Sequence, residues 1–270
     1  MTGWDCHAHL FGPYQQFPLS ADRSYTPPEA VLGQYLQLLE RLALKHGVLV
    51  QPSAYGPDHS LLLSALETAP HLRGVTVVKP DELAGLLANP SAGVQRLRAA
   101  RFSHRSAAGA NFAGSASLHD LKQMAHSLAD AGWHAELWTD CKVLPAIEAD
   151  LAALPLPVVI DHMGGFDVQQ GVNEPGFVAL LRLLESGKVW VKLCVYRNLL
   201  GQATLASGRV FHQMLMAANP QRLIWGSDWP HLRVAPVPDA AGLLNTFKTW
   251  TADDTLVQQV LKTNPALLYR

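Results

Sequence analysis

The stretch Trp4-Asp5-Cys6-His7-Ala8-His9 decides the interpretation of this chain. Asp5, His7 and His9 alternate with Cys6 and Ala8, so a strand over residues 3–10 is expected to project the three polar side chains from one face. In a barrel that face is the interior, where imidazoles near the end of a strand can bind a metal ion or polarise a carbonyl group. Two hydrogen-bonded core histidines are the structural alternative, and the spacing alone does not decide between them.

Strand-like apolar runs recur along the rest of the chain. With the first one they number eight, and they cover residues 3–10, 47–53, 73–80, 94–103, 133–139, 157–164, 189–196 and 222–231. Segments with helical periodicity lie between them, including 28–45, 118–131, 176–186 and 239–261. Dividing 270 residues by eight leaves about 34 per unit, the size of a βα repeat. We therefore expect an α/β fold with one (β/α)₈ TIM barrel as a single domain over residues 1–270.

An open doubly wound sheet is the alternative architecture. The count of eight strands and the absence of a G-x-G-x-x-G fingerprint after the first strand both disfavour it.

The composition excludes several classes of partner. The chain is 49% hydrophobic and 16% charged, and its 21 basic and 22 acidic residues give a net charge of −1. Without a basic block, binding to nucleic acid or to an anionic membrane surface is not expected. Partners are therefore expected to be small molecules or copies of the chain itself. No membrane span or signal peptide is recognisable, so a cytoplasmic protein is expected. Three scattered cysteines predict buried, reduced thiols rather than disulfides. The oligomeric state cannot be inferred from the sequence.

Two further segments are expected to meet the first strand at one rim of the barrel. Asp228 lies in Gly226-Ser-Asp-Trp-Pro-His231 at the end of the last strand, which becomes a neighbour of the first strand when a barrel closes. His162 lies in Ile160-Asp-His-Met-Gly-Gly165 at the end of the sixth strand. A buried carboxylate needs a cation or an imidazole beside it, so Asp228 is expected to face the histidines. A structural salt bridge explains this pairing almost as well.

These motifs resemble the amidohydrolase superfamily, and within it the branch similar to 2-pyrone-4,6-dicarboxylate lactonases. The resemblance spans nearly the whole chain and rests on an ordered set of motifs: Asp5-Cys-His-Ala-His9, Phe11-Gly-Pro13, Arg23-Ser-Tyr-Thr-Pro-Pro28, Val50-Gln-Pro-Ser53, Asp161-His-Met-Gly164, Trp225-Gly-Ser-Asp-Trp-Pro-His231 and Thr263-Asn-Pro265. The short H-x-H motif is unspecific, whereas the ordered set is highly specific. The resemblance implies a reaction centre formed by His7, His9 and Asp228, with His162 beside it.

The metal content is the main open question at the reaction centre. Superfamily members with two metals use a bridging carboxylated lysine, usually on the fourth strand, and a histidine at the end of the fifth. In this chain the fourth strand contains arginines and no lysine, and the only histidine of the fifth strand, His134, lies at its N-terminal end. A two-metal site of the superfamily type is therefore not expected. One zinc ion held by His7, His9 and Asp228, with His162 as a further ligand, remains geometrically feasible. The pyrone lactonases that the chain resembles work without metal, so we expect no cofactor and keep zinc as the alternative.

Substrate contacts are predicted from polar residues at the strand ends. The resemblance places Tyr25, Ser53 and Arg101 at positions that hold a dicarboxylate, and Arg197 and His231 lie near the same rim. Exposed rim charge is the better interpretation of Arg105 and also of Arg197. The chain departs from the family pattern at two positions: Gly165 stands where an arginine is expected, and Trp138 where a tyrosine is expected. A lactone with one carboxylate, or a sugar lactone, is therefore as plausible a substrate as the dicarboxylate pyrone.

The expected activity is hydrolysis of a small anionic lactone in the catabolism of aromatic or sugar acids. Asp228 would act as general base on a water molecule, while His7, His9 and His162 donate hydrogen bonds to the oxyanion. Asp228 would then return the proton to the departing ring oxygen. Two alternatives remain: a zinc-dependent decarboxylase or hydrolase of the same superfamily, and a carboxylate-binding barrel without catalysis. Glu136 and Lys192, charged residues within strands, are expected to form a structural pair inside the barrel.

Overall fold

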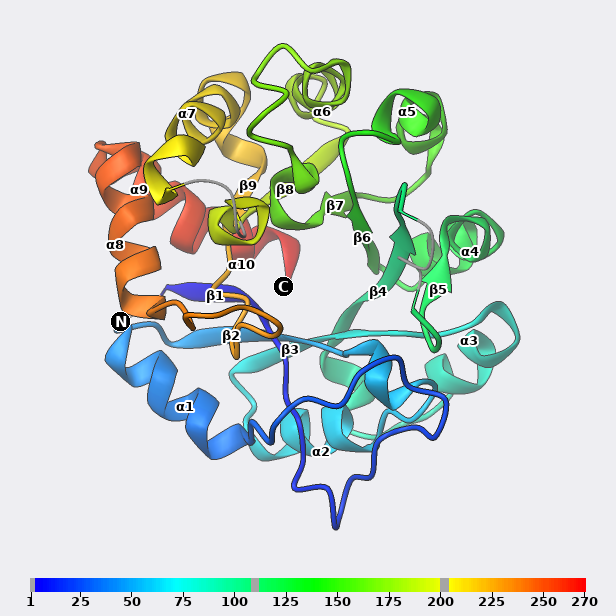
Figure 1. Cartoon of the computed structure of the whole chain (residues 1–270). Coiled ribbons are helices and arrows are strands. Elements are labelled where there is room, and N and C mark those ends of the chain that lie inside the picture. The colour runs from blue at the N-terminus through cyan, green and yellow to red at the C-terminus, as the bar shows by residue number, and fades with distance from the viewer. Residues whose placement is uncertain (1–2, 108–111, 200–203) are drawn as a thin grey trace.

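A barrel of eight parallel strands forms the centre of the protein. The computed structural model describes residues 3–107, 112–199 and 204–270. The strands follow one another around the barrel as β1 (Trp4–Ala8), β2 (His46–Val50), β3 (Leu72–Thr76), β4 (Leu97–His104), β6 (His134–Thr139), β7 (Val158–Ile160), β8 (Val189–Leu193) and β9 (Leu223–Trp225). A two-residue strand, β5 (Ala116–Ser117), is added to β4. The predicted (β/α)₈ barrel is confirmed (Figure 1).

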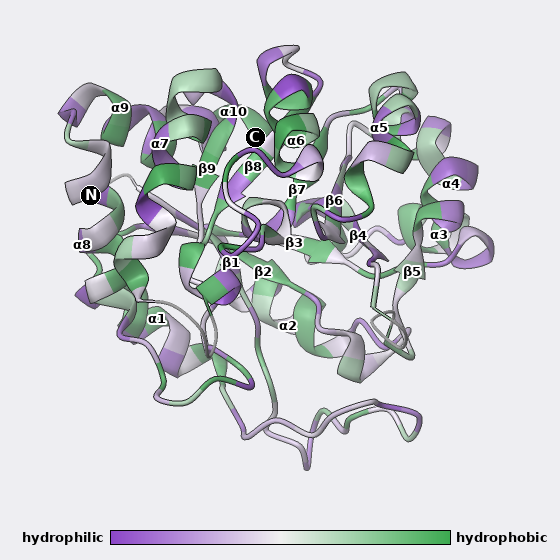
Figure 2. Ribbon diagram, turned by 45° about the horizontal axis from the view of Figure 1, so that its top comes forward, coloured by the Kyte–Doolittle hydropathy of each residue, from purple (hydrophilic) through white to green (hydrophobic). Residues whose placement is uncertain are grey.

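Helices surround the barrel, and those that precede the last strand connect successive strands (Figure 1). They are α1 (Leu32–Arg41), α2 (Ser60–Thr68), α3 (Pro80–Leu87), α4 (Leu118–Asp130), α5 (Leu144–Ala153), α6 (Pro175–Glu185), α7 (Arg209–Ala218), α8 (Ala240–Thr251), α9 (Asp254–Gln258) and α10 (Asn264–Leu268). Figure 2 shows purple and green residues mixed along them, as expected of helices that cover a core on one side and meet water on the other. The helix predicted over 239–261 is divided, because Ala252 adopts a left-handed conformation and the Asp253 side chain caps α9.

Two apolar layers stabilise this arrangement. The larger lies between the strands and the helices. The smaller fills the inside of the barrel and consists of Trp4, Cys6, Val48, Val50, Val75, Ala99, Val159, Trp190, Ile224 and Tyr269. Burial of such side chains contributes about 25 cal/mol per Å² of apolar surface removed from water. The polar residues of the barrel interior therefore lie against a packed apolar layer.

A bulge in β1 changes the predicted direction of one side chain. Asp5 pairs with Gly47 of β2, but Ala8 pairs with Leu49, so the strict alternation is lost between these two pairs. Cys6 belongs to the inner layer, whereas Asp5 accepts a hydrogen bond from the Tyr35 hydroxyl of α1 at 3.2 Å. The prediction that Asp5 shares a face with His7 and His9 is therefore wrong. The bulge turns His7 toward the interior and leaves Asp5 on the helix side.

The barrel closes where the segment after β9 meets β1. The Asp228 amide donates to the His7 carbonyl at 2.8 Å, and the His9 amide donates to the Trp229 carbonyl at 2.8 Å. Gly226 permits this approach, because a Cβ atom there would lie 2.6 Å from His7 Cβ. The first and last strands thus place Asp228 directly beside the two histidines.

The three cysteines are free and buried, as predicted. Within the described ranges, no helix combines the length and apolar character that crossing a membrane requires.

The contact at Gly226 predicts a large stability difference between two glycine substitutions. Gly226→Ala is expected to lower the free energy of unfolding by about 1–3 kcal/mol, because the added methyl overlaps His7. Gly85→Ala is the matched control: nothing lies within 4 Å of its added Cβ, and alanine is the better helix former by about 0.5–1 kcal/mol. Urea unfolding of both variants measures the difference. Equal stability of the two would contradict the close approach of β9 to β1.

Candidate active site

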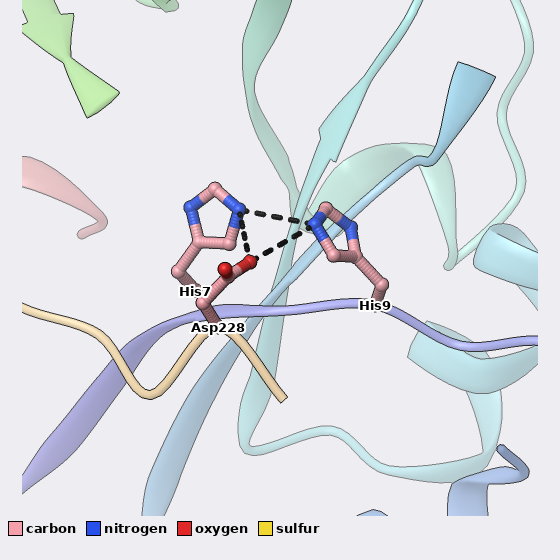
Figure 3. A group of neighbouring side chains, drawn as sticks. All are labelled: His7, His9 and Asp228. Atoms are coloured by element: carbon pink, nitrogen blue, oxygen red, sulfur yellow. Dashed lines mark hydrogen bonds and ion pairs between the residues drawn. The ribbon is translucent and has the colours of Figure 1, made fainter. Parts of the chain in front are cut away.

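Four predicted residues converge at one end of the barrel. Asp228 Oδ1 lies 3.6 Å from His7 Nε2, 3.5 Å from His9 Nε2 and 3.6 Å from His162 Nε2. The two histidines of the first strand approach each other as well, with 3.2 Å between their Nε2 atoms. In Figure 3 the His7 and His9 rings rise from one segment of chain and turn their nitrogens toward the Asp228 carboxylate. Three imidazoles therefore face one carboxylate oxygen.

The backbone at this centre adopts rarely populated conformations. Seven described residues other than glycine have a positive φ, and five of them lie here: His162, Met163, Asp228, His231 and Arg233. Such conformations cost about 1–3 kcal/mol each and persist where the surrounding structure determines them. They turn the chain sharply after β7 and β9. These turns bring His162 and Asp228 over the open end of the barrel.

Asp228 is held through its second oxygen. Oδ2 accepts from the Tyr196 hydroxyl at 2.6 Å, from Arg197 Nε at 2.9 Å and from Arg197 Nη2. Burial alone would raise the pKa of Asp228, but the Arg197 guanidinium and the His162 ring outweigh it and hold the pKa well below its ordinary value. The carboxylate is therefore ionised at neutral pH. Its Oδ1 atom remains directed at the imidazoles.

His9 has its tautomer set by the backbone. Its Nδ1 lies 2.7 Å from the Val50 carbonyl, which can only accept a hydrogen bond. Burial lowers the pKa of His9 and favours the neutral ring. With the proton on Nδ1, the Nε2 atom faces the centre as an acceptor. The predicted role of His9 as a donor to an oxyanion does not match this arrangement.

A cavity of about 100 Å³ opens at the centre. Eight of the predicted site residues line it: His9, Tyr25, Ser53, Arg101, Trp138, His162, Arg197 and Asp228. His7 lies behind this lining and is fully buried. His231 is also outside the lining, because the turn at its positive φ places its ring against Tyr196, with 5.3 Å between the ring centroids.

The arginines of the cavity have different roles. Arg101 binds Asp161 through Nε and Nη2, at 3.2 and 3.0 Å. Arg197 holds Asp228 and donates through Nη1 to the Leu232 carbonyl at 2.8 Å. Arg197 is thus neither simple rim charge nor a free fork for a substrate.

Arg233 was missed in the sequence, although it lines the cavity. Its guanidinium lies 5.4 Å from the Phe112 ring centroid, and the described residues place no carboxylate within ion-pair distance of it. The other lining residues that were not predicted are Gln51, Val77, Phe102, Ser103, Phe112, Ser115 and Leu232. The available signal was position, since Arg233 follows the Trp-Pro-His turn by two residues at the end of the last strand.

The comparisons with known proteins agree with this architecture. The chain belongs to the amidohydrolase family (Amidohydro_2), whose model matches residues 4–270. It is similar to a 4-sulfomuconolactone hydrolase of Rhizobium radiobacter, at 30% identity over 98% of this chain and 89% of that protein. It is also similar to a 2-pyrone-4,6-dicarboxylate hydrolase of Comamonas testosteroni, at 31% identity over 98% and 89% of the two chains. A crystal structure from Acinetobacter baumannii, described as a probable 2-pyrone-4,6-dicarboxylic acid hydrolase with citric acid bound, has a TM-score of 0.82 and 26% identity, and the similarity covers 100% and 99% of the two chains.

A zinc ion can be tested against the donor atoms of the centre. The atoms His7 Nε2, His9 Nε2 and Asp228 Oδ1 are 3.2 to 3.6 Å apart. Ligands at about 2.0–2.1 Å from a tetrahedral zinc ion are about 3.3–3.4 Å apart, so the spacing suits zinc. An amidohydrolase of Burkholderia multivorans with bound zinc has a TM-score of 0.74 at 20% identity, a likeness that bears on the fold alone.

The surroundings of His7 do not suit zinc. A metal-bound histidine donates its other ring N–H to a carboxylate, a carbonyl or water. Here Lys192 Nζ lies 2.9 Å from His7 Nδ1, closer than the carboxylate oxygen Asp161 Oδ1 at 3.4 Å, and an ammonium group cannot accept a hydrogen bond. The residues therefore match zinc in their spacing but not in the hydrogen bonding of His7.

Proposed function

We propose that the protein hydrolyses a small anionic lactone, such as 2-pyrone-4,6-dicarboxylate, 4-sulfomuconolactone or a related cyclic ester. The observation that carries the proposal is that one oxygen of the ionised Asp228 carboxylate, Oδ1, faces three imidazoles beside a cavity lined by arginines. The two curated relatives act on lactones according to their names, and these lactones carry carboxylate or sulfonate groups. The whole activity is assigned to one domain spanning residues 1–270.

The reaction begins with the removal of a proton from water. Asp228 Oδ1 accepts this proton while the water oxygen forms a bond to the lactone carbonyl carbon. His9 Nε2, an acceptor, orients the second hydrogen of the water. His7 and His162 donate hydrogen bonds to the carbonyl oxygen as it gains negative charge. The ring C–O bond then breaks, and Asp228 returns its proton to the departing ring oxygen.

The rate acceleration that these groups can provide is sufficient for an activated ester. A positioned base contributes about 10²–10⁴-fold and each oxyanion donor about 10²–10³-fold. Together these reach about 10⁶-fold, the lower range of enzymatic rate acceleration. A lactone whose leaving group is a stabilised enolate needs little more than this. An amide substrate would depend far more on a Lewis acid.

A zinc-dependent hydrolase or decarboxylase of the same superfamily is the second candidate. The spacing of His7, His9 and Asp228 favours it, and the Lys192 contact to His7 opposes it. When bound, zinc would polarise a substrate carbonyl or lower the pKa of a water molecule. Because the Lys192 contact to His7 opposes a metal, we propose catalysis by the side chains alone, without a cofactor.

Arginine supplies the affinity for an anion in this proposal. Three guanidinium groups line the cavity, and the Asp228 charge there is balanced by Arg197. Asp161 balances Arg101 in the same way, so Arg233 leaves a net positive charge at the open end, which suits the carboxylate or sulfonate of a lactone. Trp138 provides a flat apolar wall, with the Arg101 guanidinium 5.8 Å from its ring centroid. An unsaturated ring fits between such groups.

The role of Asp228 as the base can be tested by removing its charge. Asp228→Asn is expected to lower kcat by about 10²–10⁴-fold, because the amide keeps the shape of the carboxylate but cannot accept the proton. Turnover is measured on a panel of carboxylated and sulfonated lactones, with protein of known metal content, before and after chelation. Asp150→Asn, a change in a surface ion pair with Lys122, is the control. Near-normal turnover by Asp228→Asn would exclude Asp228 as the base. Loss of wild-type activity when a chelator removes bound zinc would favour the zinc-dependent enzyme.

A further prediction concerns the dependence of the rate on pH. The folded-state pKa of Asp228 lies well below 3.8, so the basic form persists as the pH falls and is lost only in strong acid. Arg197→Met removes the guanidinium that lowers this pKa, so the acid limb of the kcat/KM profile should move to higher pH. Arg197→Lys keeps a cation beside Asp228 and should shift the limb less. Identical acid limbs in all three proteins would contradict the control of Asp228 by Arg197.

Another prediction concerns the recognition of the anion. Arg233→Met is expected to raise KM about tenfold, which corresponds to about 1.4 kcal/mol, and to leave kcat nearly unchanged. Arg209→Met, which removes an exposed arginine of α7, is the control. Steady-state kinetics on the best lactone of the panel measures both variants. An unchanged KM in Arg233→Met would exclude a contact between Arg233 and the substrate.

A further inference from the structure

We propose that Lys192 is a positioning residue that keeps the proton of His7 on Nε2, where it faces the reaction centre. The role in catalysis rests on the lactone hydrolysis proposed above. The tautomer itself is a property of the free protein and can be observed without a substrate.

Lys192 is a fully buried cation inside the barrel. It lies on β8, and its Nζ atom hydrogen-bonds to Glu136 Oε2 at 2.7 Å and to His7 Nδ1 at 2.9 Å. Asp161 Oδ1 forms an ion pair with it at 3.1 Å. Nearby carboxylates outweigh the effect of burial and raise the pKa of Lys192 above its ordinary value, so the group is an ammonium at neutral pH.

The ammonium occupies the centre of a cluster that could otherwise hold a cation. His7, Glu136 and Asp161 each turn one ligand atom toward a common point. Lys192 Nζ lies 2.7 to 3.1 Å from all three of these residues. The side chain thus acts as a permanent cation at that point.

The contact decides which nitrogen of His7 carries the proton. An ammonium group donates and cannot accept, so a protonated Nδ1 would direct one N–H at another across 2.9 Å. The competing acceptor, Asp161 Oδ1, is farther from Nδ1, at 3.4 Å, and is already paired with the Lys192 ammonium at 3.1 Å. A second proton on the ring would have to lie on Nδ1, directly beside the ammonium, so the ring is neutral. The one ring proton is therefore on Nε2.

The position of the ammonium is determined from two sides. Glu136 accepts through Oε1 from the Tyr269 hydroxyl at 2.7 Å, and Asp161 accepts through Oδ2 from Arg101. Two cations, Lys192 and Arg101, balance the two carboxylates, so the cluster carries no uncompensated charge. The sequence pattern indicated only a structural pair. The contact with His7 gives this pair a direct connection to the reaction centre.

The arrangement gives two neighbouring histidines opposite roles. The Val50 carbonyl makes His9 Nε2 an acceptor, and Lys192 makes His7 Nε2 a donor. The two Nε2 atoms are 3.2 Å apart, a distance suited to one N–H between them. A substrate oxyanion would accept a hydrogen bond from His7 Nε2, and His9 Nε2 would accept one from a water molecule.

Nitrogen-15 NMR of the histidine side chains tests the tautomer directly. In the wild-type protein at neutral pH, the His7 signals should show a protonated Nε2 and an unprotonated Nδ1, with assignment by their loss in His7→Gln. A protonated Nδ1 would overturn the proposal even if the enzyme hydrolyses lactones. Failure to hydrolyse any lactone would overturn the proposed function and leave this measurement unaffected.

Two variants test the role of the lysine. Lys192→Met is expected to lose the fixed tautomer and to lower kcat at least tenfold with little change in KM, since one oxyanion donor contributes about 10²–10³-fold when fully removed. The double variant Lys192→Met/Glu136→Gln removes one charge of each sign and serves if the single variant does not fold. Lys122→Met, the same change at the surface, is the control. A folded double variant with the wild-type His7 tautomer and kcat would overturn the role of Lys192.

Discussion

The backbone hydrogen bonds between β1 and the segment after β9 are the constraint on which the site depends. They join the first strand of the barrel to the segment after the last one, because the Asp228 amide donates to the His7 carbonyl and the His9 amide donates to the Trp229 carbonyl. The side chains of these residues are thereby held within bonding distance before any substrate arrives. Preorganisation of this kind lowers the cost of ordering groups during a reaction.

The interior of the barrel changes in character along its axis. An apolar layer that includes Tyr269 lies at one end, the cluster of Glu136, Lys192 and Asp161 lies above it, and the imidazoles and the cavity follow. Each charge of this cluster has an opposite charge beside it, which reduces the cost of removing both from water. The same charges are close enough to the imidazoles to influence where their protons reside. Stability and chemistry therefore share one set of contacts in this protein.

The sequence predicted most of the barrel because its strands are short, apolar and regularly spaced. The convergence of His7, His9, His162 and Asp228 could be anticipated from the order of strands around a closed barrel. The direction of Asp5 could not, since a bulge leaves no recognisable pattern in one sequence. The contacts of Arg197 and Arg233 depend on turns at positive φ after the strands. Local backbone geometry of this kind determines where a long side chain ends, and alternation rules do not describe it.

The bulge in β1 links the outside of the barrel to its reaction centre. On the helix side, the Asp5 carboxylate accepts a hydrogen bond from the Tyr35 hydroxyl of α1. It also accepts hydrogen bonds from the Ser227 amide and hydroxyl, at 2.7 and 2.6 Å. Ser227 immediately precedes Asp228. One carboxylate thus clamps an outer helix to the residue next to the proposed base. A change in the packing of α1 would be transmitted through this clamp, so substitutions in a helix that does not line the cavity would reach the proposed base.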